Sequence, residues 1–457
     1  MQKTDLLVIG GSAGGLLSAT TARKVYGNVK ITLIRDTEKV MVPCGIPYIF
    51  GTLKDTSKNV IPDRMLMNND IELIIDKVVK IDRENKIVET KNNDVVQYKK
   101  LIIATGSLPI TPTFIPGYDL ENVYAVLKDE SYLKNILEKV QNFNNIVVIG
   151  GGFIGVEFAE QMKSLNKNVT LVELADACLW QAFDKTFTDE IEGTLKKNGI
   201  EIKTKTKVKK ILGDDKVQEV ELNNGEKIKA DVVILGMGVK PNAQLAKDAG
   251  IQLNEKGSII IDQYMRTSDP NIFAVGDCAD KKCFFTGKNV PVLLASTAAT
   301  EAKIAGCNVF QLRLIRQNKG TISAFSTKLF GRTYAAAGMT EAKAKEEGFS
   351  LMIGEFSTFD KHPGSLPNAQ KINIKLIFSK CSGVILGAQI SGGDTVGEMI
   401  NVLSLAIQKE ITASELNTFQ VATHPLVSAS PIAYPINAAS MEAITKNCKH
   451  LNKDFQI

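Results

Sequence analysis

The sequence predicts an α/β protein with two βαβ units and a C-terminal α+β domain. At residues 6–26 a short apolar strand runs directly into a glycine-rich turn and a helix, and the same pattern returns at residues 146–165. From residue 325 onward, strand-like segments such as 372–378 and 384–390 precede a helix at 395–407. At about 150 residues per domain, the length of the chain suits roughly three domains.

Composition excludes several classes of protein. The 55 basic and 50 acidic side chains leave a net charge of +5 without a block of like charges, which argues against nucleic-acid binding. The apolar runs are strand-sized and the N-terminus lacks a basic region with a cleavage site, so we expect neither a membrane span nor a secretory signal. Seven cysteines at unrelated spacings argue against a disulfide framework and predict a reducing, cytoplasmic location.

The first βαβ unit has a glycine-rich turn that suits a dinucleotide pyrophosphate. Small residues let the phosphates approach the backbone, and the N-terminus of the following helix faces them. The residues expected there are Gly10, Ser12, Ala13, Gly14 and Gly15. Because Ser12 replaces the usual middle glycine, a tight turn without a ligand is the alternative. The position where an acidic residue should bind the ribose holds Arg35, so we assign this contact to the neighbouring Asp36.

Residues 41–50, with the sequence MVPCGIPYIF, contain a candidate reactive thiol, Cys44. Gly45 leaves the sulfur open to approach, and a helix beginning here would favour the thiolate through its N-terminal partial charge. Five residues on stands Ile49, and the chain has no C-x-x-C pair. Cys44 would therefore cycle as a mixed disulfide, a persulfide or a sulfenic acid. A buried, inert cysteine is the alternative.

A strand at 101–108 ends in Ala104, Thr105 and Gly106, small residues that could lie against a cofactor. The alternative is a strand with an ordinary glycine turn. Before it, segments 71–75 and 86–90 are expected to pair as strands. After it, three closely spaced prolines between 109 and 116 indicate a linker.

The second βαβ unit has a complete GxGxxG, followed by a strand at 169–172 that leads into Glu173. A carboxylate there binds ribose hydroxyls and repels a 2′-phosphate, which predicts NADH in preference to NADPH. The binding residues expected in the turn are Gly150, Gly152, Phe153, Ile154 and Gly155. Gly238 permits a close backbone approach in segment 232–242, and Gly276 with Asp277 ends a later strand where a carboxylate can accept from a sugar hydroxyl.

Taken in order, the motifs GGSAGG, PCGIPY, ATGS, GGGFIG with Glu157 and Glu173, and AVGD resemble the pyridine nucleotide-disulfide oxidoreductase family over essentially the whole chain. The lone cysteine resembles the single-cysteine branch, which comprises NADH peroxidases and oxidases, coenzyme A-disulfide reductases and polysulfide reductases. The resemblance implies FAD in a discontinuous domain, residues 1–115 and 243–324, and NADH in residues 116–242. It also implies that residues 325–457 form a dimerisation domain of a homodimer.

Departures from the family pattern help to choose among the activities of the branch, and Ala13 favours the disulfide or polysulfide reductases. Oxidases and peroxidases of the branch have a histidine in the first glycine-rich turn, where this chain has Ala13. The disulfide reductases have tyrosines in a stretch that corresponds to 360–368, which contains none. His424 with Pro425 resembles the His-Pro of the dithiol reductases, whose histidine crosses the dimer as an acid/base. His362 and Tyr434 are weaker candidates.

These features predict a FAD-dependent NADH oxidoreductase in which Cys44 attacks a disulfide, a polysulfide, a CoA persulfide or sulfur. An NADH oxidase that reduces O2 through a cysteine sulfenic acid is the first alternative, and a redox-responsive flavoprotein that only binds a partner is the second. Arg23 and Lys24 resemble basic residues that bind coenzyme A phosphates. Cys278 and Cys283 have no two further ligands nearby in the sequence, so we expect no metal.

Overall fold

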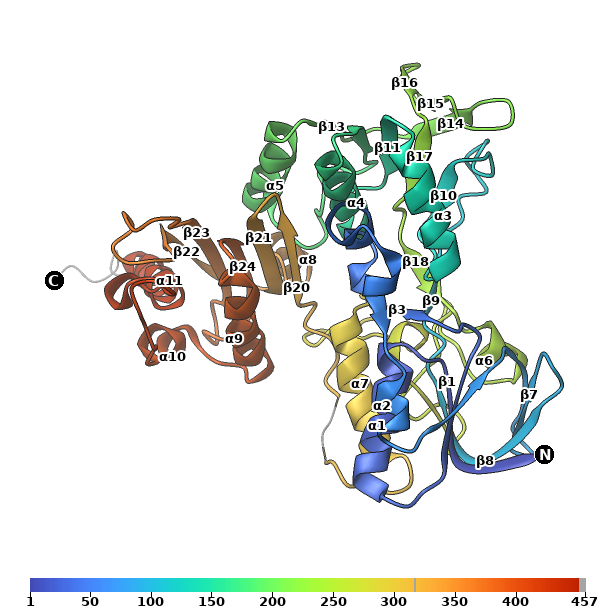
Figure 1. The fold of residues 1–457 in the computed structure, drawn as a ribbon. Coiled ribbons are helices and arrows are strands. Elements are labelled where there is room, and N and C mark those ends of the chain that lie inside the picture. Colours follow the sequence, from blue (N-terminus) through green and yellow to red (C-terminus); the bar gives the residue numbers. More distant parts are fainter. Residues whose placement is uncertain (316–317, 452–457) are drawn as a thin grey trace.

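The computed structural model describes residues 1–315 and 318–451, which form two parallel-sheet units and a C-terminal domain (Figure 1). The unit that contains α1 (Ala13–Tyr26) and α7 (Ala295–Asn308) lies below the green and teal unit around α4 (Phe153–Ser164), and the C-terminal domain lies beside both. The expected α/β architecture with an α+β C-terminal domain is confirmed.

The N-terminal unit is a seven-stranded sheet of order β5-β2-β1-β8-β7-β6, with β19 also paired to β8. Its central strands are parallel, with Ile9 opposite both Ile34 and Ile103. Segments 72–75 and 87–90 do not pair with each other as expected, because the first pairs with β2 and the second lies between β6 and β8. The strands are β1 (Gln2–Ile9), β2 (Ile31–Arg35), β5 (Glu72–Ile75), β6 (Val78–Asp82), β7 (Ile87–Thr90), β8 (Val95–Ile103) and β19 (Ile272–Ala274).

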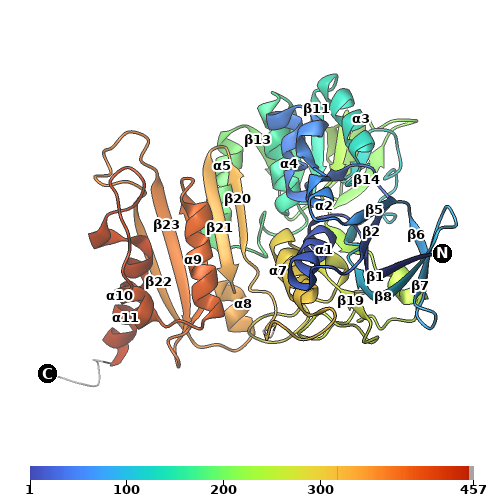
Figure 2. The same ribbon diagram turned by 60° about the horizontal axis from the view of Figure 1, so that its bottom comes forward.

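Two helices, α1 (Ala13–Tyr26) and α7 (Ala295–Asn308), pack against each other beside this sheet (Figure 2). Their buried residues, such as Ala19 and Ile304, join Leu6 and Val8 of β1 in one apolar cluster. Short elements complete the unit: β3 (Val40–Met41), β4 (Val60–Ile61), α2 (Arg64–Met67) and α6 (Gln244–Asp248).

The second unit is a five-stranded parallel sheet of order β10-β17-β11-β12-β13 with an attached antiparallel sheet, β14-β15-β16. Its strands are β10 (Val123–Ala125), β11 (Asn145–Ile149), β12 (Asn168–Val172), β13 (Ile200–Lys203), β14 (Val208–Leu212), β15 (Glu219–Leu222), β16 (Lys227–Lys229) and β17 (Val232–Leu235). Its helices are α3 (Glu130–Gln141), α4 (Phe153–Ser164) and α5 (Lys185–Lys197).

Two antiparallel connections, β9 (Ser107–Pro109) and β18 (Val239–Pro241), join the two units. Asn242 fastens this crossing to the segment that contains Thr105, since the Thr105 hydroxyl donates to the Asn242 carbonyl at 2.6 Å. In return, the Asn242 amide N–H donates to the Gly106 carbonyl at 2.9 Å. The chain therefore leaves and re-enters the first unit at one place.

The C-terminal domain is a five-stranded antiparallel sheet of order β20-β21-β24-β23-β22. Alternate residues of β21 belong to different cores: Ala335 and Ala337 pack with helices α9–α11, while Tyr334 and Ala336 pack with the second unit. Both faces of the sheet are thus covered. The elements are β20 (Phe325–Leu329), β21 (Arg332–Gly338), α8 (Glu341–Glu346), β22 (Leu351–Phe359), β23 (Lys371–Ser379), β24 (Ile385–Gly392), α9 (Val396–Gln408), α10 (Ala413–Thr418) and α11 (Pro435–Leu451).

The segment after Cys44 packs against the second unit although it belongs in sequence to the first. Ile46, Ile49 and Phe50 are at most 2% exposed and share a core with Phe158 of α4. The Phe50 and Phe158 ring centroids are 5.2 Å apart. In Figure 1 this blue segment lies against α4. Helix α4 is therefore adjacent to both its own glycine-rich turn and the Cys44 segment.

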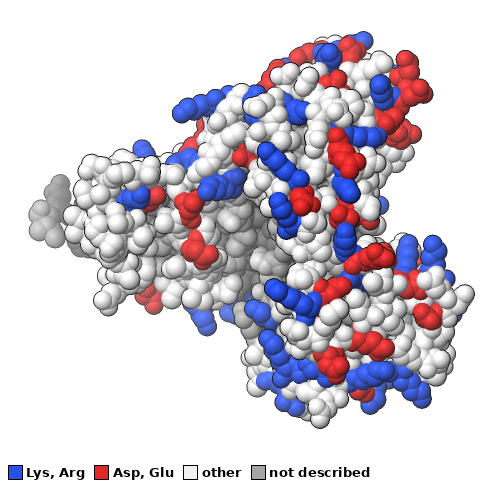
Figure 3. All heavy atoms as spheres, viewed as in Figure 1, with Lys and Arg blue, Asp and Glu red and all other residues white. Residues whose placement is uncertain are grey.

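Lysine and arginine alternate with aspartate and glutamate over the face shown in Figure 3. No helix among residues 1–315 and 318–451 is both long and apolar enough to cross a membrane.

The close approach of α4 to β11 generates a stability prediction. A Cβ at Gly155 would lie 1.8 Å from the Gly150 carbonyl oxygen, whereas a Cβ at Gly193 of α5 would meet nothing within 4 Å. Gly155→Ala should lower the thermal unfolding midpoint, because the added methyl group would force the backbone of α4 away from Gly150. Gly193→Ala, the matched control, should raise it slightly, since alanine favours a helix interior by about 1 kcal/mol over glycine. Equal midpoints for the two variants would contradict this account of the turn.

Candidate active site

The two glycine-rich turns have nearly the same geometry. Gly10 and Gly150 have φ of 111° and 108°, in the region that favours glycine. A Cβ at Gly15 would lie 1.9 Å from the Gly10 carbonyl oxygen, which matches the approach of Gly155 to Gly150. Each helix therefore begins directly against the end of its first strand.

Both helices can receive a pyrophosphate at their N-termini. Among the described residues, no side chain caps α1 at Ser12 or α4 at Gly152, and neither first turn holds an acidic residue. A Cβ at Gly152 would meet nothing within 4 Å, so the backbone there is open to a ligand. Uncapped N–H groups with no carboxylate beside them suit phosphate oxygens. The expected residues of both turns thus fit the two dinucleotides.

Glu173 is held immediately after β12 by two backbone donors. The N–H groups of Gly151 and Ala175 donate to its two carboxylate oxygens, the latter at 2.6 Å. This fixes a negative charge at the end of the strand, beside the turn. The position agrees with the ribose-binding role that the sequence predicts.

The register of the first unit places Arg35, and not Asp36, at the counterpart of Glu173. Ile34 lies opposite Ile9 as Val172 lies opposite Ile149, so Arg35 and Glu173 are the next residues in each unit. The Arg35 guanidinium is bound to the Asp63 carboxylate, with N–O distances of 2.6 and 2.8 Å. A guanidinium has no acceptor for a ribose hydroxyl. Asp36 is exposed after the strand, and its ribose contact stays a prediction.

Asp277 lies close to the segment that contains Ala104, Thr105 and Gly106. Its carboxylate accepts a hydrogen bond from the Ser107 hydroxyl at 2.7 Å and lies 3.7 Å from the Lys128 ammonium. The preceding residue, Gly276, has φ of 76°, and Gly238, just before β18, has φ of 88°, so both lie in the region that favours glycine. The structure thus brings three sequence-predicted segments, 104–106, 276–277 and the one that contains Gly238, to one region.

A buried ion pair supports this turn. Lys281 and Glu301 lie 3.0 Å apart, each with a side chain 3% exposed. The Glu301 carboxylate accepts from the Gly276 N–H at 2.8 Å, and the Lys281 ammonium donates to the Gly276 carbonyl at 2.7 Å. Both backbone groups of Gly276 are therefore fixed. The sequence alone did not indicate this pair.

Cys44 lies in a short 3₁₀ turn, Pro43–Gly45, and not at the N-terminus of an α-helix. A π-helix of five residues, Ile49–Leu53, follows it. The residue is exposed, whereas its neighbour Ile46 is buried. The expectation that a helix N-terminus activates the thiol is therefore wrong, because apolar packing of residues 46–50 determines the local conformation.

The charges around Cys44 also differ from the expectation of a lowered pKa. Partial desolvation by surrounding protein atoms raises the pKa of the Cys44 thiol, and the Glu157 and Asp277 carboxylates raise it further. The Lys128 ammonium acts in the opposite direction. In the protein alone, the protonated thiol is therefore favoured.

Three side chains at this site were not singled out from the sequence as acting on the thiol. Glu157 of α4 accepts a hydrogen bond from Thr327 of β20 at 2.8 Å. Burial raises the pKa of Tyr48 well above its ordinary value, and Glu157 contributes in the same direction. The motif GGGFIG gave a signal for Glu157, but Thr327 lies far along the chain and had none.

His424 lies in an exposed loop of the C-terminal domain. Its backbone N–H donates to the Ser428 hydroxyl at 2.9 Å, and its Nδ1 faces the Leu426 N–H at 3.3 Å. His362 adjoins the same loop, since its Nδ1 lies 3.0 Å from the Ser428 carbonyl oxygen. Tyr434 instead packs edge-on against Phe419. An approach of His424 to a thiol in a second chain stays a prediction.

Arg23 is engaged within the protein, and the possible coenzyme A contact at Arg23 and Lys24 stays a prediction. Its guanidinium donates to the carbonyls of Asn69 at 2.8 Å and Asp70 at 2.6 Å, and also to that of Gly27. Arg23 therefore joins the end of α1 to the loop that follows α2.

Cys278 is buried and Cys283 is partly buried. No group of three or more His, Cys, Asp or Glu residues suited to a metal occurs within the described part of the chain.

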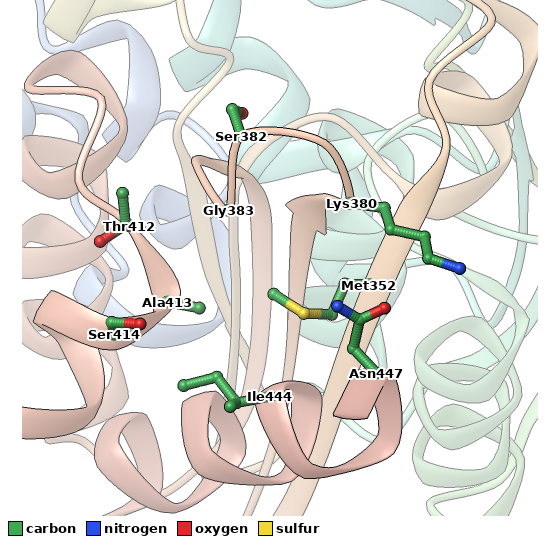
Figure 4. A pocket seen from close by; sticks show the side chains of 9 residues that line it. All are labelled: Met352, Lys380, Ser382, Gly383, Thr412, Ala413, Ser414, Ile444 and Asn447. Carbon is green, nitrogen blue, oxygen red and sulfur yellow. The ribbon is translucent and has the colours of Figure 1, made fainter. Parts of the chain in front are cut away.

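A cavity of about 270 Å³ lies in the C-terminal domain, away from these residues (Figure 4). Met352, Thr412 and Ile444 line it. The Thr412 hydroxyl is already engaged in a capping box with Glu415. None of the sequence-predicted site residues lines this cavity.

Comparisons with known proteins identify the family of the chain. The family model "Pyridine nucleotide-disulphide oxidoreductase" matches residues 4–302, and the dimerisation-domain model of the same family matches 325–432. An NADH oxidase of Methanocaldococcus jannaschii is 30% identical over 451 residues, 96% of this chain and 98% of that protein. An NAD(P)H coenzyme A polysulfide/persulfide reductase of Pyrococcus horikoshii is 30% identical over 399 residues, 86% of this chain and 88% of that protein.

Among solved structures, the NAD-dependent persulfide reductase from A. fulgidus superposes with a TM-score of 0.89 at 32% identity, covering 97% of this chain and 84% of that one. The chain therefore belongs to the pyridine nucleotide-disulphide oxidoreductase family and is a FAD-dependent NAD(P)H oxidoreductase.

Proposed function

We propose that the protein is a FAD-dependent NADH:disulfide or polysulfide oxidoreductase that acts through Cys44 alone. The single observation that supports this most strongly is the position of Cys44, an exposed thiol between the Asp277 turn and α4. The proposed acceptors are low-molecular-weight disulfides, CoA disulfide, CoA persulfide, polysulfide or sulfur, since each offers sulfur to a thiolate. Names of relatives include CoA-dependent sulfur and persulfide reductases.

Each part of the chain has a role in this proposal. The turn at Gly10–Gly15 and Asp277 bind FAD, and the turn at Gly150–Gly155 with Glu173 binds NADH. Bound FAD supplies a two-electron relay between nicotinamide and sulfur. Helix α4 supports both the NADH turn and the Cys44 segment, so it keeps their spacing constant. Lys128 favours the thiolate against the two carboxylates that oppose it.

An NADH oxidase that reduces O2 through a Cys44 sulfenic acid is the second candidate. Relatives named NADH oxidase favour it. Ala13 weighs against it, because no other ionisable side chain replaces a histidine in that turn. A redox-responsive binding module without efficient turnover is the remaining alternative.

We further propose that the chain acts in the cytoplasm as a homodimer in which His424 of one protomer approaches Cys44 of its partner. The match of residues 325–432 to a dimerisation domain supports the dimer. The domains proposed are 1–115 with 243–324 for FAD, 116–242 for NADH and 325–457 for dimerisation, of which 452–457 lie outside the described residues.

Cys44→Ser tests the thiol. The variant should retain flavin that NADH bleaches but lose at least about 100-fold in turnover with CoA disulfide and polysulfide, because serine cannot form the mixed disulfide. Activity is measured as acceptor-dependent NADH oxidation without oxygen. Cys381→Ser, at another exposed cysteine, is the control and should behave as wild type. Turnover that survives in Cys44→Ser, or wild-type O2 consumption faster than acceptor reduction, would contradict the proposal.

Glu173→Ala tests nucleotide choice. Its carboxylate would repel a 2′-phosphate, so its removal should narrow the preference of kcat/KM for NADH over NADPH by roughly tenfold, or about 1.4 kcal/mol. Asp176→Asn is the control, because Asp176 is a more exposed acidic residue near the end of the same strand. It should change the ratio of kcat/KM for NADH to that for NADPH less than Glu173→Ala does. A wild-type preference for NADPH would refute the assignment.

His424→Ala tests the partner's contribution. A leaving thiolate gains from a proton, and histidine can supply one near neutrality. The variant should slow reoxidation of reduced enzyme by CoA disulfide about tenfold or more, and by polysulfide less, while stopped-flow reduction by NADH is nearly unchanged. A fully active monomer would remove His424 from the mechanism.

A further inference from the structure

The buried pair of Lys281 and Glu301 directs its hydrogen bonds to the turn that carries Asp277. The Lys281 ammonium has three N–H donors. It donates to the carbonyls of Gly276 at 2.7 Å and Ala279 at 2.9 Å, and to Oε2 of Glu301 at 3.1 Å. The same Oε2 accepts from the Gly276 N–H at 2.8 Å. Every donor of the ammonium is therefore engaged, and the pair binds both backbone groups of the residue just before Asp277.

A gain in stability does not by itself explain two charges at this depth. Both side chains are only 3% exposed. Desolvation of the charges opposes folding, so replacing a buried ion pair by apolar side chains of similar volume is often neutral or stabilising. An apolar pair, however, cannot form hydrogen bonds to a backbone. Gly276, with φ of 76° and no Cβ, has wide conformational freedom, and the two polar groups restrict it to one conformation.

The restricted turn lies beside the first glycine-rich turn. A Cβ at Gly14 would lie 3.3 Å from Cγ2 of Val275, so α1 begins against the residue that follows β19. The Val275 N–H donates to the Ile103 carbonyl at 3.0 Å, which joins the ends of β19 and β8. The Glu301 side chain reaches this place from α7, which packs along α1 (Figures 1 and 2). Asp277 therefore follows a parallel strand at the edge where the nucleotide turn lies.

The Asp277 carboxylate has one oxygen available for a ligand. Its Oδ2 accepts from the Ser107 hydroxyl at 2.7 Å and lies 3.7 Å from the Lys128 ammonium. Within residues 1–315 and 318–451, no hydrogen-bond donor contacts its Oδ1. A carboxylate oxygen can accept from a sugar hydroxyl. The direction of this oxygen depends on the backbone at Gly276, which the ion pair fixes.

We propose that the Lys281–Glu301 pair positions Asp277 for FAD, by holding the Gly276 backbone so that the Asp277 carboxylate faces a sugar hydroxyl of the cofactor. This inference rests on the proposed FAD contact of Asp277. Lys281 and Glu301 are positioning residues, since they act through the Gly276 backbone. Without them the turn occupies its binding conformation for only part of the time, and the apparent affinity for FAD falls by that fraction.

The test is the dissociation constant of FAD, measured by flavin fluorescence as the holoenzyme is diluted. Lys281→Met combined with Glu301→Leu removes both charges, so no unpaired charge stays buried. This double variant should raise the dissociation constant at least about tenfold, because the turn is no longer held. Asp277→Ala should raise it by a similar factor. When the two changes are combined, the double variant should add less than about twofold to the effect of Asp277→Ala, since the pair acts through Asp277.

Lys375→Met is the matched control. Lys375 is another buried lysine, and it pairs with Asp184 and Glu341 at the interface with the C-terminal domain. This variant should lower the thermal unfolding midpoint, because it leaves buried charge uncompensated, yet keep the FAD dissociation constant within about twofold of wild type. The control therefore separates a loss of stability from a loss of FAD positioning.

An unchanged FAD dissociation constant in the double variant would overturn the proposal. Additive effects of the double variant and Asp277→Ala would also overturn it, because they indicate a general loss of structure. If the double variant does not fold, Glu301→Gln decides. Its amide can accept through one oxygen only, so the constant should rise about threefold, and no rise would refute the inference.

The measurement needs no sulfur acceptor, so it is independent of the activity that Cys44→Ser reports. Wild-type FAD affinity in Asp277→Ala would refute the FAD contact of Asp277, and this inference with it. A loss of affinity in Asp277→Ala without a loss in the double variant would refute the positioning role alone. The two failures are therefore distinguishable.

Discussion

The packing of residues 46–53 against α4 is the interaction on which the rest of the site depends. Phe50 contacts Phe158, and the Thr52 hydroxyl donates to Gln161 at 2.9 Å. A Cβ at Gly51 would lie 2.2 Å from the Ser164 hydroxyl oxygen, so the two segments meet without intervening space. This contact joins a loop of the first unit to α4, the helix that follows the second glycine-rich turn. It thereby fixes Cys44 relative to both nucleotide turns.

The same packing explains why the thiol is not activated as its sequence suggests. Cys44 lies in a 3₁₀ turn just before the buried Ile46, and a turn of three residues does not align peptide dipoles as a long helix does. It also brings Cys44 within the field of the Glu157 charge. The Lys128 ammonium opposes this effect and lowers the pKa of the Cys44 thiol.

Features set by local sequence could be predicted, whereas features set by distant contacts could not. The glycine turns follow from spacing within about 30 residues, and Glu173 follows from the end of the next strand. Asp36 is the acidic residue next to the expected position, but strand register gives its neighbour Arg35 the place equivalent to that of Glu173. Thr327 is remote from Glu157 in sequence, and only the docking of β20 on α4 brings them together.

That docking is itself held by a buried polar interface between α5 and the C-terminal sheet. Lys375, with a side chain 6% exposed, pairs with Asp184 at 3.0 Å and Glu341 at 2.7 Å. Removing one partner of such a pair costs about 3–5 kcal/mol because it leaves an uncompensated buried charge. The orientation of the sheet is therefore strongly specified.

Apolar packing extends this interface to the nucleotide turn. Phe325 of β20 stacks on Phe153 at a centroid distance of 5.1 Å, two residues before Thr327 on the same strand. A strand fixed at Phe325 places Thr327 on the same face, since side chains alternate. The C-terminal domain thus contacts Phe153, which follows the second glycine-rich turn, through Phe325, and contacts Glu157 through Thr327. The hydrogen bond between Thr327 and Glu157 is therefore a contact between the C-terminal domain and α4.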